Sequence, residues 1–276
     1  MSIEIRSAST AEDCRIIEQL QRQVWGEGSG EVPFHLLLTV AKEGGVVLLA
    51  LDQNRPVGFA FGFPALTKDG RLKIASHQAG VLPELHDQGL GYQIKLAQRE
   101  ATLALGIKLM TWTFDPLQGR NARFNFRKLG AVSNRYTPNL YGEMTDEINQ
   151  GLPSDRFTAA WWLDSPHVLR RLSGEDVEPN GVALGWPVLN PAVPQPDGLF
   201  IPPDDVNLPH GPRCLVEIPA DLAALKAKNA EAALTWRLQT RHIFQTAFEH
   251  GYTATDLLRH KGRNYYLLQK DWKKIV

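Results

Sequence analysis

The sequence predicts an α/β protein in which a mixed, mostly antiparallel sheet carries helices on both faces, followed by a smaller C-terminal α/β module. Three observations lead to this prediction. Segments with strand-like apolar patterns occur between segments with the helical spacing of apolar residues. Short turns join several of the strands directly, as in hairpins. Nine of the 18 prolines lie between Gly174 and Pro212, which divides the chain because proline breaks both helices and central strands.

The first elements are a strand, two helices and a hairpin. Residues 3–6 form a short apolar strand, and Ser9-x-x-Glu12 is a capping box that predicts the start of a helix. A second helix is expected over residues 33–42. Apolar strands over 45–51 and 57–63 are joined by a polar turn, which indicates a hairpin. The first helix is expected to turn Ile16, Ile17, Leu20 and Val24 inward.

The next elements alternate between strand and helix. A strand is predicted over 72–81 and a helix over 91–106, with further strands over 107–114 and 157–163 and a short helix over 121–129. The helix over 91–106 has two distinct faces. One carries Ile94, Ala97, Ala101 and Ala104, and another carries Lys95, Arg99 and Thr102.

The proline cluster sets the predicted domain organisation. We expect a first domain over residues 1–172, a proline-rich connector over 173–212 that packs along a surface, and a C-terminal module over 213–276. The module reads as strand, long helix and strand. Its helix has a stripe of Trp236, Thr240, Ile243, Phe244, Ala247 and Phe248 that we expect to be buried.

Composition excludes several classes of protein. The chain has 43% hydrophobic residues, and its 30 basic and 30 acidic residues give no net charge, which argues against binding to nucleic acid or anionic lipid by bulk electrostatics. The longest apolar run, residues 46–51, is too short to cross a membrane, and the N-terminus lacks signal-peptide features. Cys14 and Cys214 have no metal-ligand spacing, so we expect a cytoplasmic protein without a metal site.

The segment between the strand over 72–81 and the following helix contains the most informative motif. Gly89 and Gly91 lie at the start of the helix, where glycine permits close approach of a ligand and the first N–H groups point outward. With the helix dipole, these groups can bind a pyrophosphate. The segment lacks the third glycine of a Rossmann fingerprint and the Gly-Lys-Ser/Thr of a P-loop.

This segment resembles motif A of the GNAT acyltransferase superfamily, Arg/Gln-x-x-Gly-x-Gly/Ala. His86 occupies the Arg/Gln position, followed by Gly89 and Gly91. Residues 121–131, which end in Leu-Gly-Ala, resemble the family's motif B. Segments 111–117 and 151–157 are similar to those of a bacterial group of GNAT acyltransferases. In element order the resemblance covers about residues 3–165.

The resemblance implies a GNAT fold that binds acyl-CoA, with acetyl-CoA as the default donor and succinyl-CoA as an alternative. The pantetheine arm would lie where the strands over 72–81 and 107–114 separate, paired with Gly80 and Val81, with Asn121 on its other side. Phe126 occupies the position of a family tyrosine beside the cofactor. The pyrophosphate would be held by the segment made of His86, Asp87, Gln88, Gly89, Leu90, Gly91 and Tyr92.

Two residues depart from the family pattern. His86 replaces Arg/Gln and carries a less dependable charge at neutral pH. Phe126 stands where many GNAT enzymes have a tyrosine that protonates the leaving thiolate. Phenylalanine donates no proton, so either another group such as Tyr136 or Tyr141 serves, or the thiolate leaves unaided.

Two further residues are candidates for handling the proton of an acceptor amine. His77 lies four residues before Val81, so regular alternation would place both on one face of the strand. His77 would then be a base, with a histidine satisfied inside the sheet as the alternative. Asp115 follows the strand over 107–114 and would be a base or orient an ammonium group, but Asp before Pro is also common in turns.

Together, these observations predict a cytoplasmic acyl-CoA-dependent N-acyltransferase acting on the amine of a small molecule such as an amino acid. The alternative is a CoA-binding or scaffold protein that has lost catalysis, which the departures at His86 and Phe126 make plausible. The C-terminal module reads either as a degenerate second GNAT half or as a cap that completes the acceptor pocket or a homodimer contact. No nucleic acid, membrane or metal partner is expected.

Overall fold

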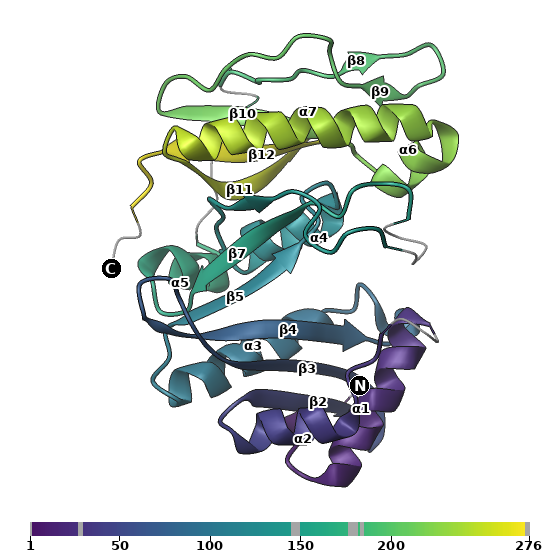
Figure 1. The fold of residues 1–276 in the computed structure, drawn as a ribbon, viewed down its shortest axis with the longest axis vertical. Helices are drawn as coiled ribbons and strands as arrows, with labels where there is room; N and C mark the ends of the chain where they lie inside the picture. Colours follow the sequence, from purple (N-terminus) through teal and green to yellow (C-terminus); the bar gives the residue numbers. More distant parts are fainter. Residues whose placement is uncertain (1, 27–29, 145–149, 176–181, 183–184, 274–276) are drawn as a thin grey trace. The chain divides into compact units, whose positions relative to one another are not determined.

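The computed structural model describes residues 2–26, 30–144, 150–175, 182 and 185–273 (Figure 1). The chain divides into two compact units, Met1–Trp112 and Thr113–Val276. The predicted boundary at residue 172 does not coincide with this division at residue 112. Thr113 and Phe114, the last residues of the strand Leu109–Phe114, belong with the C-terminal part of the chain, as does everything that follows them. Whether residues 1–172 form a domain of their own stays a prediction.

The first unit has nearly every element that the sequence predicts. Its elements are β1 (Ile3–Ser7), α1 (Ala11–Trp25), α2 (Phe34–Lys42), β2 (Val46–Asp52), β3 (Arg55–Leu66), β4 (Leu72–Val81), the 3₁₀ turn η1 (Pro83–Leu85), α3 (Leu90–Ala104) and β5 (Leu109–Phe114), whose last two residues belong to the second unit. Helix α1 begins one residue later than predicted. Its N-cap is Thr10, whose hydroxyl accepts a hydrogen bond from the N–H of Asp13 (3.1 Å).

The sheet of the first unit has the order β1-β2-β3-β4-β5. Its first three pairings are antiparallel, and β4 pairs with β5 in parallel. Only a short stretch of β4 and β5 is paired, Ile74 with Met110 and Ala75 with Thr111. The predicted mixed, mostly antiparallel sheet is therefore confirmed, and β4 is released from β5 after Ala75.

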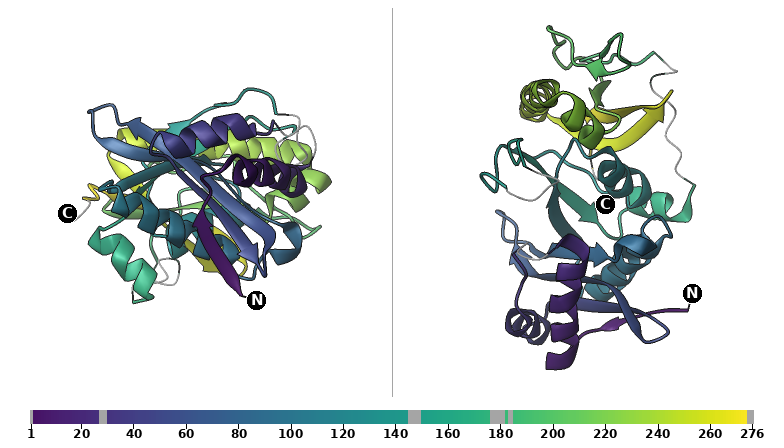
Figure 2. Two further views of the ribbon diagram at one scale, coloured as in Figure 1. Left: turned by 90° about the horizontal axis from the view of Figure 1, so that it is seen from below. Right: turned by 90° about the vertical axis from the view of Figure 1, so that its right-hand side faces the viewer.

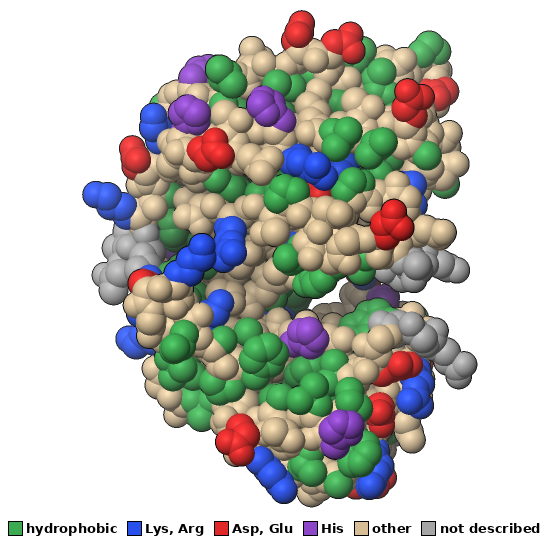
Figure 3. Space-filling model, in the orientation of Figure 1, with side chains coloured by type: hydrophobic (Ala, Val, Ile, Leu, Met, Phe, Trp, Pro, Cys, Tyr) green, Lys and Arg blue, Asp and Glu red, His purple; other side chains and the backbone are tan. Residues whose placement is uncertain are grey.

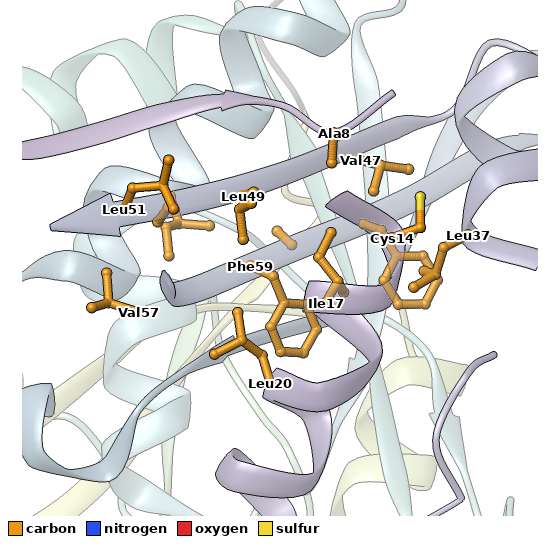
Figure 4. Close-up of a cluster of buried hydrophobic side chains, with 14 of the residues drawn as sticks. Ala8, Cys14, Ile17, Leu20, Leu37, Val47, Leu49, Leu51, Val57 and Phe59 are labelled. Carbon is orange, nitrogen blue, oxygen red and sulfur yellow. The ribbon is translucent and has the colours of Figure 1, made fainter. Parts of the chain in front are cut away.

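Helices cover both faces of this sheet, as predicted (Figure 2). On one face α1 packs closely, so that a Cβ added to Gly80 of β4 would lie 3.2 Å from Val24. On the other face α3 is as close, and a Cβ added to Gly58 of β3 would lie 2.8 Å from Ile94. Figure 4 shows the core beneath α1, where Ile17 and Leu20 meet Phe59 and other apolar side chains of β2 and β3.

The buried face of α3 is more polar than the apolar pattern suggests. Ile94 is buried as expected, but Lys95, Gln98 and Thr102 are buried too. The helical spacing predicts that Lys95 and Thr102 lie on a different face of α3 from Ile94. In the structure residues of both faces are buried. Polar contacts between α3 and the strands, described below, make this burial tolerable.

The second unit contains the rest of the elements. They are α4 (Gly119–Arg123), the π-helical turn η2 (Phe124–Lys128), β6 (Tyr136–Thr137), β7 (Arg156–Trp162), α5 (Pro166–Ser173), β8 (Val193–Pro194), β9 (Phe200–Ile201), β10 (Arg213–Ile218), α6 (Leu222–Lys228), α7 (Ala230–Glu249), β11 (Tyr252–His260) and β12 (Arg263–Lys270). β7 pairs with β6, and a separate antiparallel sheet has the order β10-β12-β11. The module predicted as strand, helix and strand thus has a second helix and a third strand.

An aromatic core holds the second unit together. Phe126 and Phe157 precede the proline-rich segment, Phe244 and Tyr266 follow it, and all four rings are fully buried in edge-to-face contacts of 4.7–6.4 Å between centroids. The predicted stripe on α7 contributes to this core, with Trp236, Thr240, Ile243, Phe244 and Ala247 buried and Phe248 partly exposed. These contacts explain why the compact units divide inside the predicted first domain.

Buried ion pairs connect the same two parts of the chain. Arg237 of α7 donates to Asp115 (2.6 Å), and Arg241 donates to both oxygens of Asp155 (2.8 Å each). Asp256 of β11 is wholly buried and accepts from Arg127 and Arg171. A buried charge is stable only when it is paired, so the C-terminal module is an integral part of this unit.

The described part of the predicted connector is built into the C-terminal sheet. Leu189 donates to the carbonyl of Leu215, and Leu215 donates to that of Pro187 (2.8 Å each). The side chain of Asn190 reproduces a strand pairing with Glu217, accepting from its N–H (2.8 Å) and donating to its carbonyl (3.1 Å). This agrees with a connector that packs along a surface. Pro179 lies outside the described residues.

The Asp115–Arg237 pair gives a test of this packing. Arg237→Met should destabilise the protein by about 3–5 kcal/mol, because it leaves the Asp115 carboxylate buried without its partner. Urea denaturation of the two proteins measures the difference. Arg259→Met, at an exposed position of β11, is the matched control and should change stability by less than about 0.5 kcal/mol. Equal stability of the Arg237 variant and the wild type would contradict the structural role of the pair.

Candidate functional site

The segment between β4 and α3 folds as a compact loop. After η1, Asp87 and Gly89 both adopt positive φ angles of 63° and 83°, which turn the chain into the helix. Asp tolerates this conformation moderately well and glycine does so freely. Gln88 is fixed between them, because its side-chain amide donates to the carbonyl of Glu84 (3.0 Å). Gly89, at the helix entry, thus adopts a left-handed conformation that glycine accepts without strain.

The N-terminus of α3 has the features of an anion-binding site. Gly89 is its N-cap, so no side chain caps the helix, and an added Cβ there would meet nothing within 4 Å. The first N–H groups of a helix lack partners within the helix, and the helix dipole adds positive potential. Of the predicted residues, Leu90 is buried and Gly91 and Tyr92 are partly exposed. Backbone groups, rather than these side chains, thus make up the predicted pyrophosphate site.

His86 closes this loop onto the end of β4. Its Nε2 lies 3.1 Å from the carbonyl of Val81, and because a carbonyl only accepts, Nε2 carries the proton. This contact engages Nε2 and leaves only Nδ1 of the ring for a further partner. His86 thus holds the loop on β4, and the carbonyl of Val81, one of the backbone groups in the region expected to pair with a pantetheine arm, has this partner already.

A β-bulge in β4 changes the predicted orientation of His77. Gly62 of β3 pairs with Ser76 and Phe61 pairs with Gln78, so His77 is an extra residue. The His77 ring contacts Phe61 and Phe63 (5.4 and 6.2 Å between centroids), on the face that α1 covers. Val81 lies on the opposite face, near Gly91 of α3. The prediction that His77 and Val81 share a face is therefore wrong, because the bulge interrupts the alternation.

His77 keeps the properties that a base needs. The residue is exposed overall, and its contact with the two phenylalanine rings partly buries the imidazole. This burial lowers the pKa of His77 below its ordinary value, so that the neutral, proton-accepting form prevails at neutral pH. The bulge also directs Gln78 to the α1 side. Its buried Oε1 has no hydrogen-bond partner among the described residues.

In the second unit, Asp115 is engaged in structural contacts. One carboxylate oxygen accepts from the N–H of Leu117 (2.8 Å) and the other from Arg237 (2.6 Å), and the residue is buried. We therefore no longer assign Asp115 as a base. Its position supports the turn interpretation, with Arg237 compensating the buried charge.

Phe126 cannot contact a cofactor as predicted. The ring has no exposed surface and lies among Phe114, Phe157 and Tyr266. The position that a tyrosine occupies in many GNAT enzymes is here part of the aromatic core. Asn121, in contrast, is exposed on α4, where its side chain accepts from Asn125 (3.3 Å).

The two tyrosines considered as proton donors differ in their surroundings. Tyr136 donates to Asp155 (2.6 Å), and burial together with that carboxylate raises the pKa of Tyr136 far above its ordinary value. Tyr141 is 55% exposed, and its hydroxyl lies 2.7 Å from that of Thr113 on β5. The guanidinium of Arg156 lies 5.4 Å from the centre of its ring.

The candidates thus fall into two groups, one in each unit. The loop residues, His77, Gly80 and Val81 belong to the first, and Asp115, Asn121, Phe126 and Tyr141 to the second. Sequence reasoning missed the polar cluster of Ser76, Lys95 and Gln98 in the first unit. A lysine among apolar residues on a helix is usually a surface residue, so no sequence signal distinguished it.

Other kinds of site are not indicated in the described parts of the chain. These residues contain no cluster of three histidines, cysteines or acidic residues fit to hold a metal ion. None of the described helices is long and apolar enough to cross a membrane. Side chains of both charges occur over the face shown in Figure 3.

No family model and no curated protein matches the sequence. Solved structures do match. A GNAT-family acetyltransferase from Streptococcus pneumoniae is 14% identical, with a TM-score of 0.48, over 58% of this chain and 98% of its own. The ribosomal-protein-S18-alanine N-acetyltransferase from Escherichia coli is 14% identical, with a TM-score of 0.45, over 58% and 92%.

The loading GNATL domain of CurA from Lyngbya majuscula is 13% identical, with a TM-score of 0.44, over 59% of this chain and 98% of its own. Each match spans nearly the whole of the solved chain and leaves part of this one uncovered. The fold prediction is supported by the observed elements themselves, which are the hairpin strands, the loop between β4 and α3, and the short parallel pairing of β4 with β5. In fold, this chain is similar to the acetyltransferases of the GNAT superfamily.

Proposed function

We propose that this chain is an N-acyltransferase that moves an acyl group from an acyl-CoA thioester to the amine of a small molecule. One observation carries the proposal. Within residues 75–92 of a single unit, β4 leaves its pairing with β5 and ends in a loop that directs uncapped helix N–H groups outward. A released strand edge suits the amides of a pantetheine arm, and the helix N-terminus suits a pyrophosphate.

In the proposed reaction the amine nitrogen attacks the thioester carbonyl directly. A C–N bond forms, the C–S bond breaks, and CoA leaves as a thiolate. His77, neutral and exposed on β4, takes the proton that the amine loses. Tyr141, in the second unit, stays the predicted donor of the proton that the thiolate takes up. A backbone N–H of β4 near Val81 would polarise the carbonyl.

A small-molecule acceptor is the simplest proposal for a chain without net charge. One of the similar folds is named for a protein acceptor, ribosomal protein S18, so peptides belong in the same assay. The first experiment is calorimetric titration with acetyl-CoA, succinyl-CoA and free CoA, followed by thiol-release assays with amino acids, polyamines and peptides. No binding at millimolar concentration would overturn the proposal. Binding without turnover on any amine would favour an inactive CoA-binding protein.

The helix entry gives a direct test of cofactor binding. Gly89→Trp should weaken CoA binding by at least about 100-fold, because the side chain would cover the anion site and the positive φ disfavours any side chain. Titration calorimetry measures the change. Gly106→Trp is the matched control, since Gly106 also has a positive φ (74°) and open surroundings but lies beyond the other end of α3. Equal affinities of the two variants would refute the loop assignment.

His77 is tested through the pH dependence of turnover. His77→Ala should lower kcat by about 100-fold or more and leave CoA affinity unchanged. In the wild type kcat/KM should fall as the pH drops below about 6.5, because protonation of His77 removes the base. This acidic limb should be absent in the variant. An unchanged limb would mean that His77 is structural and that another group takes the proton.

Tyr141 is tested by removing only its hydroxyl. Tyr141→Phe should lower kcat by about 100-fold through loss of the proton donor, with KM for acyl-CoA little changed. Thr113→Val, which removes the hydroxyl next to that of Tyr141, should have a smaller effect because the donor itself remains. If both substitutions leave kcat at the wild-type value, the thiolate leaves unaided.

A further inference from the structure

The turn that carries Tyr141 in the second unit is held by groups from outside the turn. Residues 138–141 form this turn, in which Asn139 adopts a positive φ of 44°. Within it, the N–H of Gly142 donates to the carbonyl of Asn139 (3.2 Å). Tyr141 is 55% exposed and Leu140 is 40% exposed, so burial of their side chains does not fix the turn. Its conformation therefore depends on hydrogen bonds to the neighbouring chain.

Ser154 fastens the backbone of this turn. Its hydroxyl accepts from the N–H of Tyr141 (2.9 Å) and donates to the carbonyl of Gly142 (2.8 Å). The backbone carbonyl of Ser154 accepts from the N–H of Leu140 (3.1 Å). In return, Oδ1 of Asn139 accepts from the N–H of Ser154 (3.2 Å). Because Ser154 is buried, these hydrogen bonds are shielded from water and hold the turn firmly.

Asp155 connects the turn to helix α7 of the C-terminal module. One oxygen of its wholly buried carboxylate accepts from the N–H of Asn139 (2.9 Å), and the other accepts from the hydroxyl of Tyr136 (2.6 Å). Arg241 of α7 donates to both oxygens (2.8 Å each). Burial favours the protonated acid, but these donors outweigh it and hold the pKa of Asp155 below its ordinary value. The carboxylate therefore stays charged at neutral pH and keeps its partners.

Tyr141 is thus held at two points. Its backbone is fixed by Ser154, and its hydroxyl lies 2.7 Å from that of Thr113. A proton donor must lie within hydrogen-bond reach of the atom that takes the proton, and a misplacement of about 1 Å can lower the rate about 100-fold. An exposed tyrosine on a turn meets this condition only when the turn itself is fixed.

We propose that Arg241, Asp155 and Ser154 are positioning residues for Tyr141, so that the C-terminal module takes part in the reaction. The inference rests on the proposed function, in which Tyr141 is the predicted donor of the proton that the thiolate takes up. Arg241 fixes the carboxylate of Asp155, and Asp155 and Ser154 fix the backbone of residues 139–142. That backbone sets the direction of the tyrosine side chain.

The first test compares two arginines that make the same kind of ion pair. Arg241→Met should lower kcat at least about tenfold and leave the affinity for acetyl-CoA in calorimetric titrations unchanged. Arg263→Met is the matched control, because Arg263 also donates to both oxygens of a buried carboxylate, that of Glu217. Its side chain is 27% exposed, compared with 25% for Arg241. The control should lose similar stability in urea denaturation but keep the wild-type kcat.

A double-mutant cycle separates positioning of Tyr141 from a general loss of structure. If Arg241 acts through the hydroxyl of Tyr141, Arg241→Met should change kcat less than about twofold in the Tyr141→Phe background, where that hydroxyl is already gone. A general loss of structure would lower kcat by the same factor in both backgrounds. Ser154→Ala should behave like Arg241→Met in both, and it decides the question if the arginine variant does not fold.

The outcomes separate this inference from the proposed function. If the wild type turns over and both variants keep its kcat, or lose the same factor in both backgrounds, the positioning role is refuted while the acyltransferase activity stands. If Tyr141→Phe itself leaves kcat unchanged, the inference is refuted together with the assignment of the proton donor. If no CoA thioester binds, or none is turned over, the proposed function fails and the inference fails with it.

Discussion

The short parallel pairing between β4 and β5 is the constraint on which the rest of the candidate site depends. A strand in the middle of a sheet normally has both edges occupied, and no backbone group is then left for a ligand. Here the pairing extends only over Ile74–Met110 and Ala75–Thr111. The candidate site of the first unit consists of the part of β4 beyond this pairing and the loop at the end of the strand.

The sequence predicted the elements of the first unit well, because each has a local cause. A polar turn predicted the hairpin, glycine positions predicted the loop, and apolar spacing predicted the strand Leu72–Val81 with its observed bounds. The sequence could not predict the bulge at His77. Register depends on pairing with β3, and one extra residue reverses the direction of the side chains that follow it. The burial of Lys95 was unpredictable for a related reason, since both faces of α3 proved to lie against the sheet.

The division of the chain could not be predicted because its causes are long-range. Arg237 compensates Asp115, and Phe126 packs against Tyr266, across more than one hundred residues of sequence. The residue types alone gave Asp115 a chemical role and Phe126 a place beside the cofactor. Their partners instead make both residues structural. The C-terminal module therefore supplies part of the core that supports the end of β5, which is a different role from that of an appended domain.

The glycine at position 80 determines how closely helix α1 packs on β4. A Cβ there would lie 2.9 Å from the ring of Phe59 and 3.2 Å from Val24, so helix α1 rests almost on the backbone of β4. At this distance α1 has no room to slide without carrying β4 with it. Any side chain larger than hydrogen at position 80 would have to displace Val24 of α1 or the ring of Phe59, so α1 can pack this closely on β4 only because residue 80 is a glycine.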